Sequence, residues 1–209
     1  MKRKSGLLFV VSAPSGAGKT TLCQALTASL ENLTHSISYT TRKPRPGEID
    51  GRDYFFVTQE RFRSMINAGD FAEWAEVHSN LYGTSRRVLE DMTGRGMDVI
   101  LDIDTQGARQ IKGKFPSALF IFIMPPSLDI LEERLRNRKS DDEAEIRKRM
   151  LRARDEIRDY ALYDYIIANR DFDRALNELK AIIIADRCRT KNIDPSWIGE
   201  LLQQSEGQA

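Results

Sequence analysis

The sequence has few of the side chains on which many catalytic and metal sites depend. Its 209 residues include only two cysteines, Cys23 and Cys188, and two histidines, His35 and His78. Two cysteines so far apart give neither a disulfide framework nor a set of metal ligands, which favours a reducing, cytoplasmic location. Neither histidine belongs to an evident base–nucleophile pattern, so we expect both to be ordinary surface or packed residues.

An excess of one charge and long apolar runs are also missing. The chain has 32 basic and 31 acidic residues, so no overall field draws it to nucleic acid or to an anionic membrane. No apolar segment is long enough to span a bilayer. Lys2-Arg3-Lys4 before Leu7–Val11 imitates a short signal peptide, but the apolar run is too brief for one. The composition fits a soluble protein with one sizeable core.

What is present begins with a phosphate-binding pattern. The segment LLFVVSAPSGAGKTTL, residues 7–22, runs from an apolar strand through a glycine-broken turn into a helix. Glycines let backbone N–H groups turn toward an anion, and the helix N-terminus adds its positive dipole end. Lys19 can reach the β- and γ-phosphates of a nucleotide, and Thr20 is placed for a magnesium ion. The predicted ATP-binding residues here are Ala13 (in the usual first-glycine position), Pro14, Ser15, Gly16, Ala17, Gly18, Lys19, Thr20 and Thr21.

Apolar runs alternate with amphipathic stretches along the chain, which is typical of an α/β fold with a mostly parallel sheet. The sequence predicts central strands at Leu7–Ser12, Val99–Ile103, Leu119–Met124 and Tyr165–Ala168. Four apolar stripes at helical spacing lie between and after them. They consist of Leu22, Leu26 and Leu30; Leu128, Leu131 and Leu135; Ile146, Met150, Ala153 and Ile157; and Leu176, Leu179 and Ile183.

Two segments break this alternation, and we expect them to be inserted in the core domain. Residues 36–83 open with a basic, turn-rich stretch and predict two or three short strands and one helix. In Phe71–Val77, alternation places Phe71, Glu73, Ala75 and Val77 on one face. Residues 134–158 predict a helical lid rich in arginine. The core then comprises residues 1–35, 84–133 and 159–189, and residues 190–209 form a C-terminal tail.

The first insertion carries a candidate second anion site. Arg42 and Arg45 flank Pro44, which restrains the backbone, and arginine forks match phosphate oxygens bidentately. Tyr54 and Tyr82 could add neutral hydroxyl donors. A solvated basic loop is the simpler interpretation, but a phosphate loop in the same chain favours phosphate binding. Two anion sites suggest a kinase with a phosphorylated acceptor, which needs no general base.

Two further sets of charged residues could take part in phosphoryl transfer. Asp102 and Asp104 follow an apolar strand, at the edge where open α/β sheets bind ligands, and a carboxylate there can hold magnesium. One of the two could instead cap the next helix, and the sequence does not say which. Arg134, Arg138 and Arg149 read either as a solvated helical face or as cations that a closing lid brings to the transferred phosphate.

A long run of residues resembles the fingerprint of the guanylate kinase family. It reads Ser36-x-Ser38-x-Thr40-Thr41-Arg42-x-Pro44-Arg45-x-Gly47-Glu48-x-x-Gly51-x-Asp53-Tyr54-x-Phe56-Val57. The resemblance continues through Glu73-Trp74-Ala75, Tyr82-Gly83-Thr84, Ile100-Leu101-Asp102-Ile103-Asp104-x-Gln106-Gly107 and Pro125-Pro126-Ser127. It covers about residues 6–187 and is far more specific than the phosphate loop alone.

The resemblance implies a P-loop fold and transfer of the ATP γ-phosphate to GMP, and to dGMP, with Mg²⁺ as cofactor. It implies that Arg42, Arg45, Tyr54 and Tyr82 hold the GMP phosphate, and that Ser38, Glu73 and Thr84 read guanine with Asp104 close by. It places Arg134, Arg138 and Arg149 at the transferred phosphate and Asn169 near adenine. From the residues themselves, Lys19 is a further predicted catalytic residue, and Thr20 and Asp102 are the predicted metal ligands.

The chemistry of the base supports the assignment of Glu73 independently. Guanine presents its N1–H and exocyclic amino group side by side, and one carboxylate can accept from both. Adenine presents an acceptor at N1 and would leave Glu73 unpaired, a mismatch worth several orders of magnitude in discrimination. An exposed strand residue is the simpler interpretation of Glu73, but its apolar neighbours on the same face argue against full exposure.

Some features depart from the family pattern or leave other functions open. Arg138-Lys139-Ser140-Asp141 stands where a glycine is expected after the arginine, which puts the local turn in doubt. In the tail, Trp197, Ile198, Leu201 and Leu202 could pack on the body or on another subunit in a homo-oligomer. The rival functions are a non-catalytic, peptide-binding guanylate-kinase-like module, a kinase with another phosphorylated acceptor, and nucleic-acid binding through the arginine-rich helix, which the balanced charge disfavours.

Overall fold

The computed structural model describes residues 3–77, 79–137 and 142–206, and it contains two sheets. The larger sheet is parallel throughout. In spatial order its strands are β2 (Leu33–His35), β7 (Asp98–Asp102), β1 (Leu8–Ser12), β8 (Leu119–Met124) and β9 (Tyr165–Ala168). The predicted α/β fold is confirmed, and four of these strands match the sequence-based ranges to within one residue. The sequence analysis missed β2, because three residues of which only Leu33 is buried give no apolar run.

Helices cover both faces of the larger sheet. On one face lie α1 (Lys19–Ser29) and α7 (Phe172–Arg187), and on the other α3 (Arg86–Gly94) and α4 (Thr105–Lys114). Helices α5 (Leu128–Asn137) and α6 (Glu143–Arg158) pack against each other at one end of the sheet, and 3₁₀ turns are formed by η1 (Asp159–Leu162) and η2 (Thr190–Asn192). Because side chains alternate along a strand, β1 contributes side chains to an apolar cluster on each face of the sheet. Phe9 and Val11 pack with α1 and α7, whereas Leu8 and Val10 pack with α3 and α4.

The predicted helical stripes are confirmed as buried surfaces. Each helix that carries a stripe has buried apolar residues from it: Leu22 and Leu26 in α1, Leu131 and Leu135 in α5, Ile146 and Ala153 in α6, and Leu179 and Ile183 in α7. A fully buried side chain of this size stabilises the fold by roughly 1.5–3 kcal/mol. These contacts therefore fix the helices that flank the phosphate loop.

The smaller sheet is mixed and has its own apolar cluster. Its order is β4 (Phe55–Phe56), β3 (Tyr39–Thr40), β6 (Asn80–Ser85) and β5 (Phe71–Val77), and α2 (Gln59–Asn67) packs against it through Phe62 and Met65. The expectation of two or three strands was wrong, because β3 and β4 are two-residue pairings that leave no periodic signal. The predicted alternation in β5 holds for Glu73, Ala75 and Val77 but is wrong for Phe71, because a register shift between Phe71 and Glu73 turns Phe71 to the opposite face, where it packs with Phe62 and Met65.

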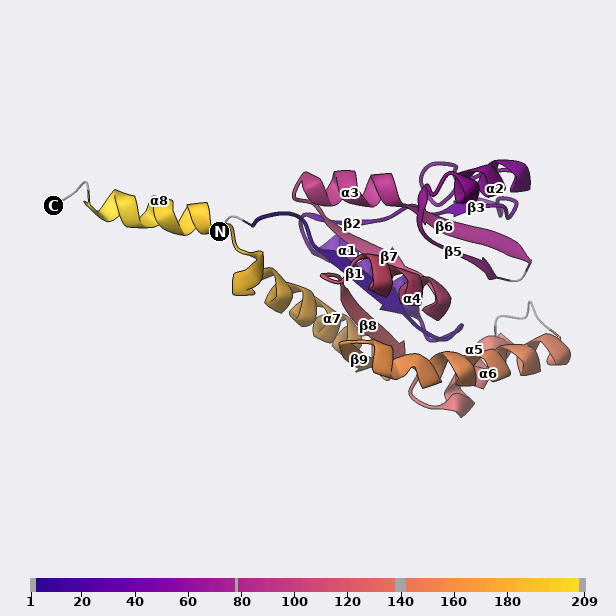
Figure 1. Cartoon of the computed structure of the whole chain (residues 1–209). Helices are drawn as coiled ribbons and strands as arrows, with labels where there is room; N and C mark the ends of the chain where they lie inside the picture. The colour runs from indigo at the N-terminus through magenta and orange to yellow at the C-terminus, as the bar shows by residue number, and fades with distance from the viewer. Residues whose placement is uncertain (1–2, 78, 138–141, 207–209) are drawn as a thin grey trace.

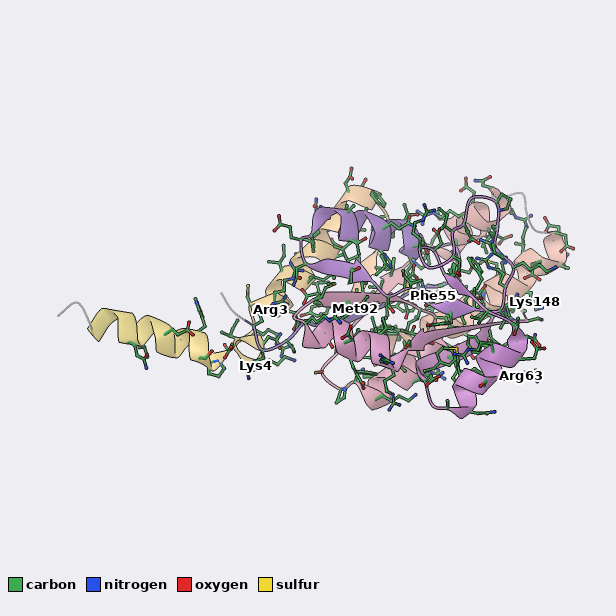
Figure 2. All side chains as sticks on the ribbon, turned by 90° about the horizontal axis from the view of Figure 1, so that it is seen from above. Arg3, Lys4, Phe55, Arg63, Met92 and Lys148 are labelled. Carbon is green, nitrogen blue, oxygen red and sulfur yellow. The ribbon has the colours of Figure 1, made fainter. Side chains whose placement is uncertain are left out.

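The smaller sheet and α8 (Pro195–Glu206) lie at opposite ends of the larger sheet. In Figure 1 the smaller sheet with α2 and the helix pair α5–α6 lie at the same end of the larger sheet, while α8 projects from the opposite end. Figure 2 shows the same separation from above: Arg63 of α2 and Lys148 of α6 lie far from Arg3 and Lys4, which lie toward α8. No helix in the described ranges has the length and apolar content to cross a membrane.

A buried carboxylate joins the segment before β1 and the end of α7 to the larger sheet. Asp98, at the start of β7, is fully buried and accepts from the Arg3 guanidinium at 2.6 Å, from Arg187 Nε at 2.7 Å and from the Leu7 backbone N–H at 2.8 Å. One side chain therefore ties the segment before β1, the end of α7 and the central sheet together. A buried charge is stable only when such partners compensate its desolvation.

We expect Asp98→Ala to lower the free energy of unfolding by about 2–4 kcal/mol, because it leaves two partly buried guanidinium groups without their acceptor. Urea denaturation followed by circular dichroism measures this. Asp91→Ala is the matched control: its ion pair with Arg95 at 3.0 Å is exposed, so its removal should change stability by no more than about 0.5 kcal/mol. Equal effects of the two substitutions would contradict the role of Asp98.

Candidate active site

The phosphate loop follows β1 and ends where α1 begins at Lys19. Gly16 and Gly18 have φ angles of 96° and 91°, in the left-handed region that favours glycine. Gly18 meets a second constraint, because a Cβ there would lie 2.6 Å from the amide nitrogen of Asn169. That nitrogen donates to the Ala17 carbonyl at 2.7 Å. Buried Asn169 thus supports the loop from behind, and the glycine pattern has a geometric cause.

Lys19 is held at the edge of the larger sheet. Its ammonium lies 2.5 Å from Asp102 Oδ1 and donates to the Ile103 carbonyl at 2.7 Å. Burial alone would lower the pKa of Lys19, but the charge and the hydrogen bond of Asp102, with smaller contributions from Cys23 and Asp104, together outweigh it, and the pKa lies above its ordinary value. Burial likewise opposes ionisation of Asp102, yet Lys19 and a hydrogen bond from Thr20 hold the pKa of Asp102 below its usual range. Both groups are charged at neutral pH.

The two aspartates after β7 have different roles. Asp104 is the N-cap of α4, and its Oδ1 accepts from the Gly107 backbone N–H at 2.9 Å. Asp102 is the residue that contacts Lys19 and Thr20. The structure thereby decides which of the two carboxylates is the helix cap and which faces the phosphate loop.

A cavity of about 400 Å³ lies between the phosphate loop, the smaller sheet and α6. Most predicted site residues line it: Ala13, Pro14, Ser15, Gly16, Gly18, Lys19, Thr20, Thr21, Ser38, Arg45, Tyr54, Glu73, Tyr82, Asp102, Asp104 and Arg149. Segments more than a hundred residues apart in the sequence therefore meet around one space.

Several other predicted residues lie outside this lining. Ala17 is a fully buried residue of the loop, its carbonyl accepts from Asn169, and Arg134 donates to the Asn169 carbonyl at 3.3 Å. Arg42 forms a two-pronged ion pair with Glu48 at 2.8 and 2.9 Å, and its guanidinium lies 5.3 Å from the centre of the Tyr54 ring. The fork that the sequence predicts for a phosphate is thus occupied by a carboxylate. Arg138 lies outside the described residues.

Glu73 is the most unusual group of the cavity. It is only 3% exposed, and its Oε1 accepts from the Thr84 hydroxyl at 2.5 Å across the β5–β6 pair. Thr84 is therefore behind Glu73 and not at the cavity surface. Burial raises the pKa of Glu73 to about 7, and the Thr84 hydrogen bond offsets part of that rise. A buried carboxylate so poised offers acceptor oxygens to a partner that presents hydrogen-bond donors.

The inner face of α6 carries two residues that the sequence analysis missed. Arg152 and Glu156 line the cavity together with Arg149. Their positions, three and seven residues after Arg149, lie on one helical face, which is the signal that could have found them. Burial raises the pKa of Glu156 to about 7, and the backbone amide of Ser15 opposes that rise by donating to its carboxylate. The helix thus meets the phosphate loop through an acidic as well as a basic group.

The pKa of Glu73 predicts a pH dependence of stability. Between its ordinary value of 4.5 and about 7, the folded state binds more protons at this group than the unfolded state does. Its contribution to the free energy of unfolding therefore falls as pH rises through that window. We expect Glu73→Gln to be more stable than the wild type at pH 8, by roughly 2–3 kcal/mol, with the difference vanishing near pH 4.5.

Urea denaturation at a series of pH values measures this difference. Glu76→Gln is the control, because Glu76 is exposed on the same strand. It should follow the wild-type profile at every pH. A Glu73→Gln variant that is less stable than the wild type at pH 8 would contradict the desolvation of Glu73.

Comparisons with known proteins agree with this geometry. The family model for guanylate kinase matches residues 5–186. The chain is 55% identical over 193 residues to a guanylate kinase of Geobacter sulfurreducens, with 92% of this chain and 95% of the relative covered. It is 54% identical over 186 residues to a guanylate kinase of Escherichia coli O157:H7, with 88% and 90% covered.

A solved structure gives the same result. The crystal structure of guanylate kinase from Anaplasma phagocytophilum superposes with a TM-score of 0.76 at 35% identity and covers 92% of each chain. Family, relatives and fold thus agree over nearly the whole length. The chain therefore belongs to the guanylate kinase family, whose members are ATP:GMP phosphotransferases.

Proposed function

We propose that the cavity binds ATP and GMP end to end and passes the γ-phosphoryl group of ATP to the GMP phosphate. One observation carries this proposal: the phosphate loop with Lys19 and the buried carboxylate Glu73 line the same cavity. A space with a phosphate cradle on one wall and an acceptor of base N–H groups on another has the polarity of a donor and an acceptor nucleotide.

On the donor side, the loop amides and Lys19 bind the β- and γ-phosphates. The Thr20 hydroxyl and the Asp102 carboxylate are the candidate ligands for Mg²⁺. Among the described residues no group of three or more His, Cys, Asp and Glu side chains could hold a metal. Mg²⁺ that arrives with ATP takes most of its ligands from phosphate and water, so one carboxylate and one hydroxyl fit it. When bound, it neutralises charge on the phosphates.

On the acceptor side, Glu73 accepts from N1–H and the amino group of guanine, Ser38 completes the base site, and Thr84 acts through Glu73, to which its hydroxyl donates. Two donors from the base would satisfy the carboxylate oxygens that burial has deprived of water. Arg45, Tyr54 and Tyr82 line the cavity and bind the GMP phosphate. Arg42 joins them by exchanging Glu48 for the phosphate, since both offer the oxygen pair that a guanidinium fork fits.

Transfer needs no general base, because a GMP phosphate oxygen is already anionic at neutral pH. That oxygen attacks the γ-phosphorus, the bond from phosphorus to the β–γ bridging oxygen breaks, and ADP leaves with the electron pair. Lys19, Arg149 and the lid arginines Arg134 and Arg138 stabilise the charge that shifts onto the bridging and γ-oxygens. The free cysteines Cys23 and Cys188 support a reducing, cytoplasmic setting.

The substrate specificity can be tested directly. We expect the purified chain with ATP and Mg²⁺ to form ADP rapidly with GMP and dGMP, and at rates lower by several orders of magnitude with AMP, CMP and UMP. A coupled ADP-release assay measures all five acceptors. Equal use of another nucleotide would indicate a different acceptor, and no turnover with any of them would favour the non-catalytic, peptide-binding module.

The role of Lys19 gives a second test. We expect Lys19→Ala to lower kcat by about 100-fold or more, because it removes a charge from the transferred phosphate, and to leave GMP binding unchanged. Steady-state kinetics and calorimetric titration with GMP measure the two quantities. Lys148→Ala, on the exposed face of α6, is the control and should retain wild-type kcat. An unaltered kcat in Lys19→Ala would remove this lysine from the mechanism.

The lid face gives a third test. We expect Arg149→Ala to lower kcat by about tenfold to 100-fold and Arg152→Ala by a smaller factor, since both guanidinium groups line the cavity. Arg147→Ala is the matched control, because Arg147 is exposed on the same helix. If all three variants behave alike, the arginines of α6 form only a solvated face.

A further inference from the structure

Helix α4 of the core lies along β5 of the smaller sheet and contacts three consecutive residues of it. β5 is at the edge of its sheet, so one side of its backbone has no neighbouring strand. Gln110 fills that place at Trp74: its amide accepts from the Trp74 N–H at 3.2 Å and donates to the Trp74 carbonyl at 2.6 Å. Lys114 donates to the Ala72 carbonyl at 2.7 Å. The strand that carries Glu73 is thus fixed on both sides of this residue by α4.

Glu73 lies between Ala72 and Trp74 in β5, and it faces Gly107, one turn before Gln110 in α4. A Cβ on Gly107 would lie 2.6 Å from Glu73 Oε2 and 3.1 Å from Glu73 Cδ. The first distance is too short for Oε2 to stay where it is, and the second requires Cδ to move by a few tenths of an ångström. Because the Thr84 hydroxyl holds Oε1, the carboxylate cannot turn away without losing that hydrogen bond. The Thr84 hydroxyl therefore holds Oε1, and the absence of a side chain on Gly107 leaves room for Oε2.

The backbone does not explain the glycine. Gly107 lies inside α4, and its φ angle is not among the positive values that favour glycine. Glycine in a helix interior costs about 1 kcal/mol relative to alanine. The space in front of Glu73 is the feature of the structure that accounts for this residue.

We propose that Gly107 is a specificity-determining positioning residue, whose missing side chain lets α4 seat Glu73 where its carboxylate can read guanine. This inference rests on the proposed function. It also links the two substrates, because the Gly107 N–H donates to Asp104, two residues after Asp102 at the phosphate loop. One helix start thereby sets the base site relative to the phosphate site.

The test compares two glycines of the same helix. Gly113 also lies in α4, and a Cβ there would meet nothing within 4 Å. We expect Gly107→Ala to raise the KM for GMP by about tenfold or more and to leave the KM for ATP unchanged. Gly113→Ala should match the wild type in both values. Equal kinetics of the two variants would overturn the inference.

A second readout separates positioning of Glu73 from a general loosening of the fold. Inosine monophosphate keeps the N1–H of GMP but lacks the amino group. The kcat/KM for GMP divided by that for inosine monophosphate therefore reports how well the carboxylate accepts from both donors. We expect Gly107→Ala to lower this ratio in the wild-type background and to leave it unchanged in Glu73→Gln. An equal fall in both backgrounds would show that Gly107 does not act through Glu73.

Two controls keep the result interpretable. The wild type must phosphorylate GMP in the same assay; its failure would contradict the proposed function, whereas a normal wild type with an unaffected Gly107→Ala variant contradicts only the inference. If Gly107→Ala does not fold, Gln110→Ala loosens the same strand at Trp74 and should lower the ratio in the same direction. An unchanged ratio in folded Gln110→Ala would overturn the role of α4.

Discussion

The ion pair between Lys19 and Asp102 is the interaction on which the site depends. It spans two adjacent parallel strands, because Lys19 follows β1, Asp102 ends β7, and Val11 and Asp102 are partners in the register. Parallel strands deliver their carboxyl ends to one edge of a sheet, so the loop after β1 and the carboxylate after β7 meet without further elements. Burial would disfavour either charge alone, and each charge stabilises the other.

A second constraint connects the smaller sheet to this edge. Glu73 is buried at the cavity wall with a pKa of about 7, although an exposed glutamate would be more stable in its ionised form. A ligand with two adjacent donors would recover that cost at Glu73. Thr84, Gly107 and the α4 contacts to β5 all serve to place this carboxylate. The smaller sheet is therefore attached to the core through the element that also carries Asp104.

Helix α6 presents groups of both charges to the cavity. The inner face of α6 presents both arginines and Glu156 to the cavity, and Glu156 interacts with the Ser15 amide of the phosphate loop. Arg42 is paired with Glu48, and Arg134 is held by the Asn169 carbonyl. In this structure carboxylate and carbonyl oxygens pair with cations that the proposed mechanism uses, so phosphate binding in that mechanism exchanges these partners. Such exchanges cost little, because each replaces one set of oxygen acceptors by another.

The elements that have a local sequence pattern could be predicted before the structure was known. The glycines of the phosphate loop, the apolar strands β1, β7, β8 and β9 and the helical stripes are fixed by backbone conformation and periodicity, and both can be read over a few residues. The phosphate-loop pattern and the family fingerprint together contain most of the residues that line the cavity, whereas Arg152 and Glu156 belong to neither pattern.

Features that depend on partners distant in sequence became evident only in the folded molecule. The structure assigned Asp102 to Lys19 and Asp104 to the cap of α4, and it paired Arg42 with Glu48. It revealed β2 and the two-residue strands β3 and β4, which exist only through their neighbours. It also explains why residue 107 is glycine, because the Glu73 side chain of the smaller sheet fills the space that a side chain would need. Contacts of this kind are set by packing across the fold, and no local pattern encodes them.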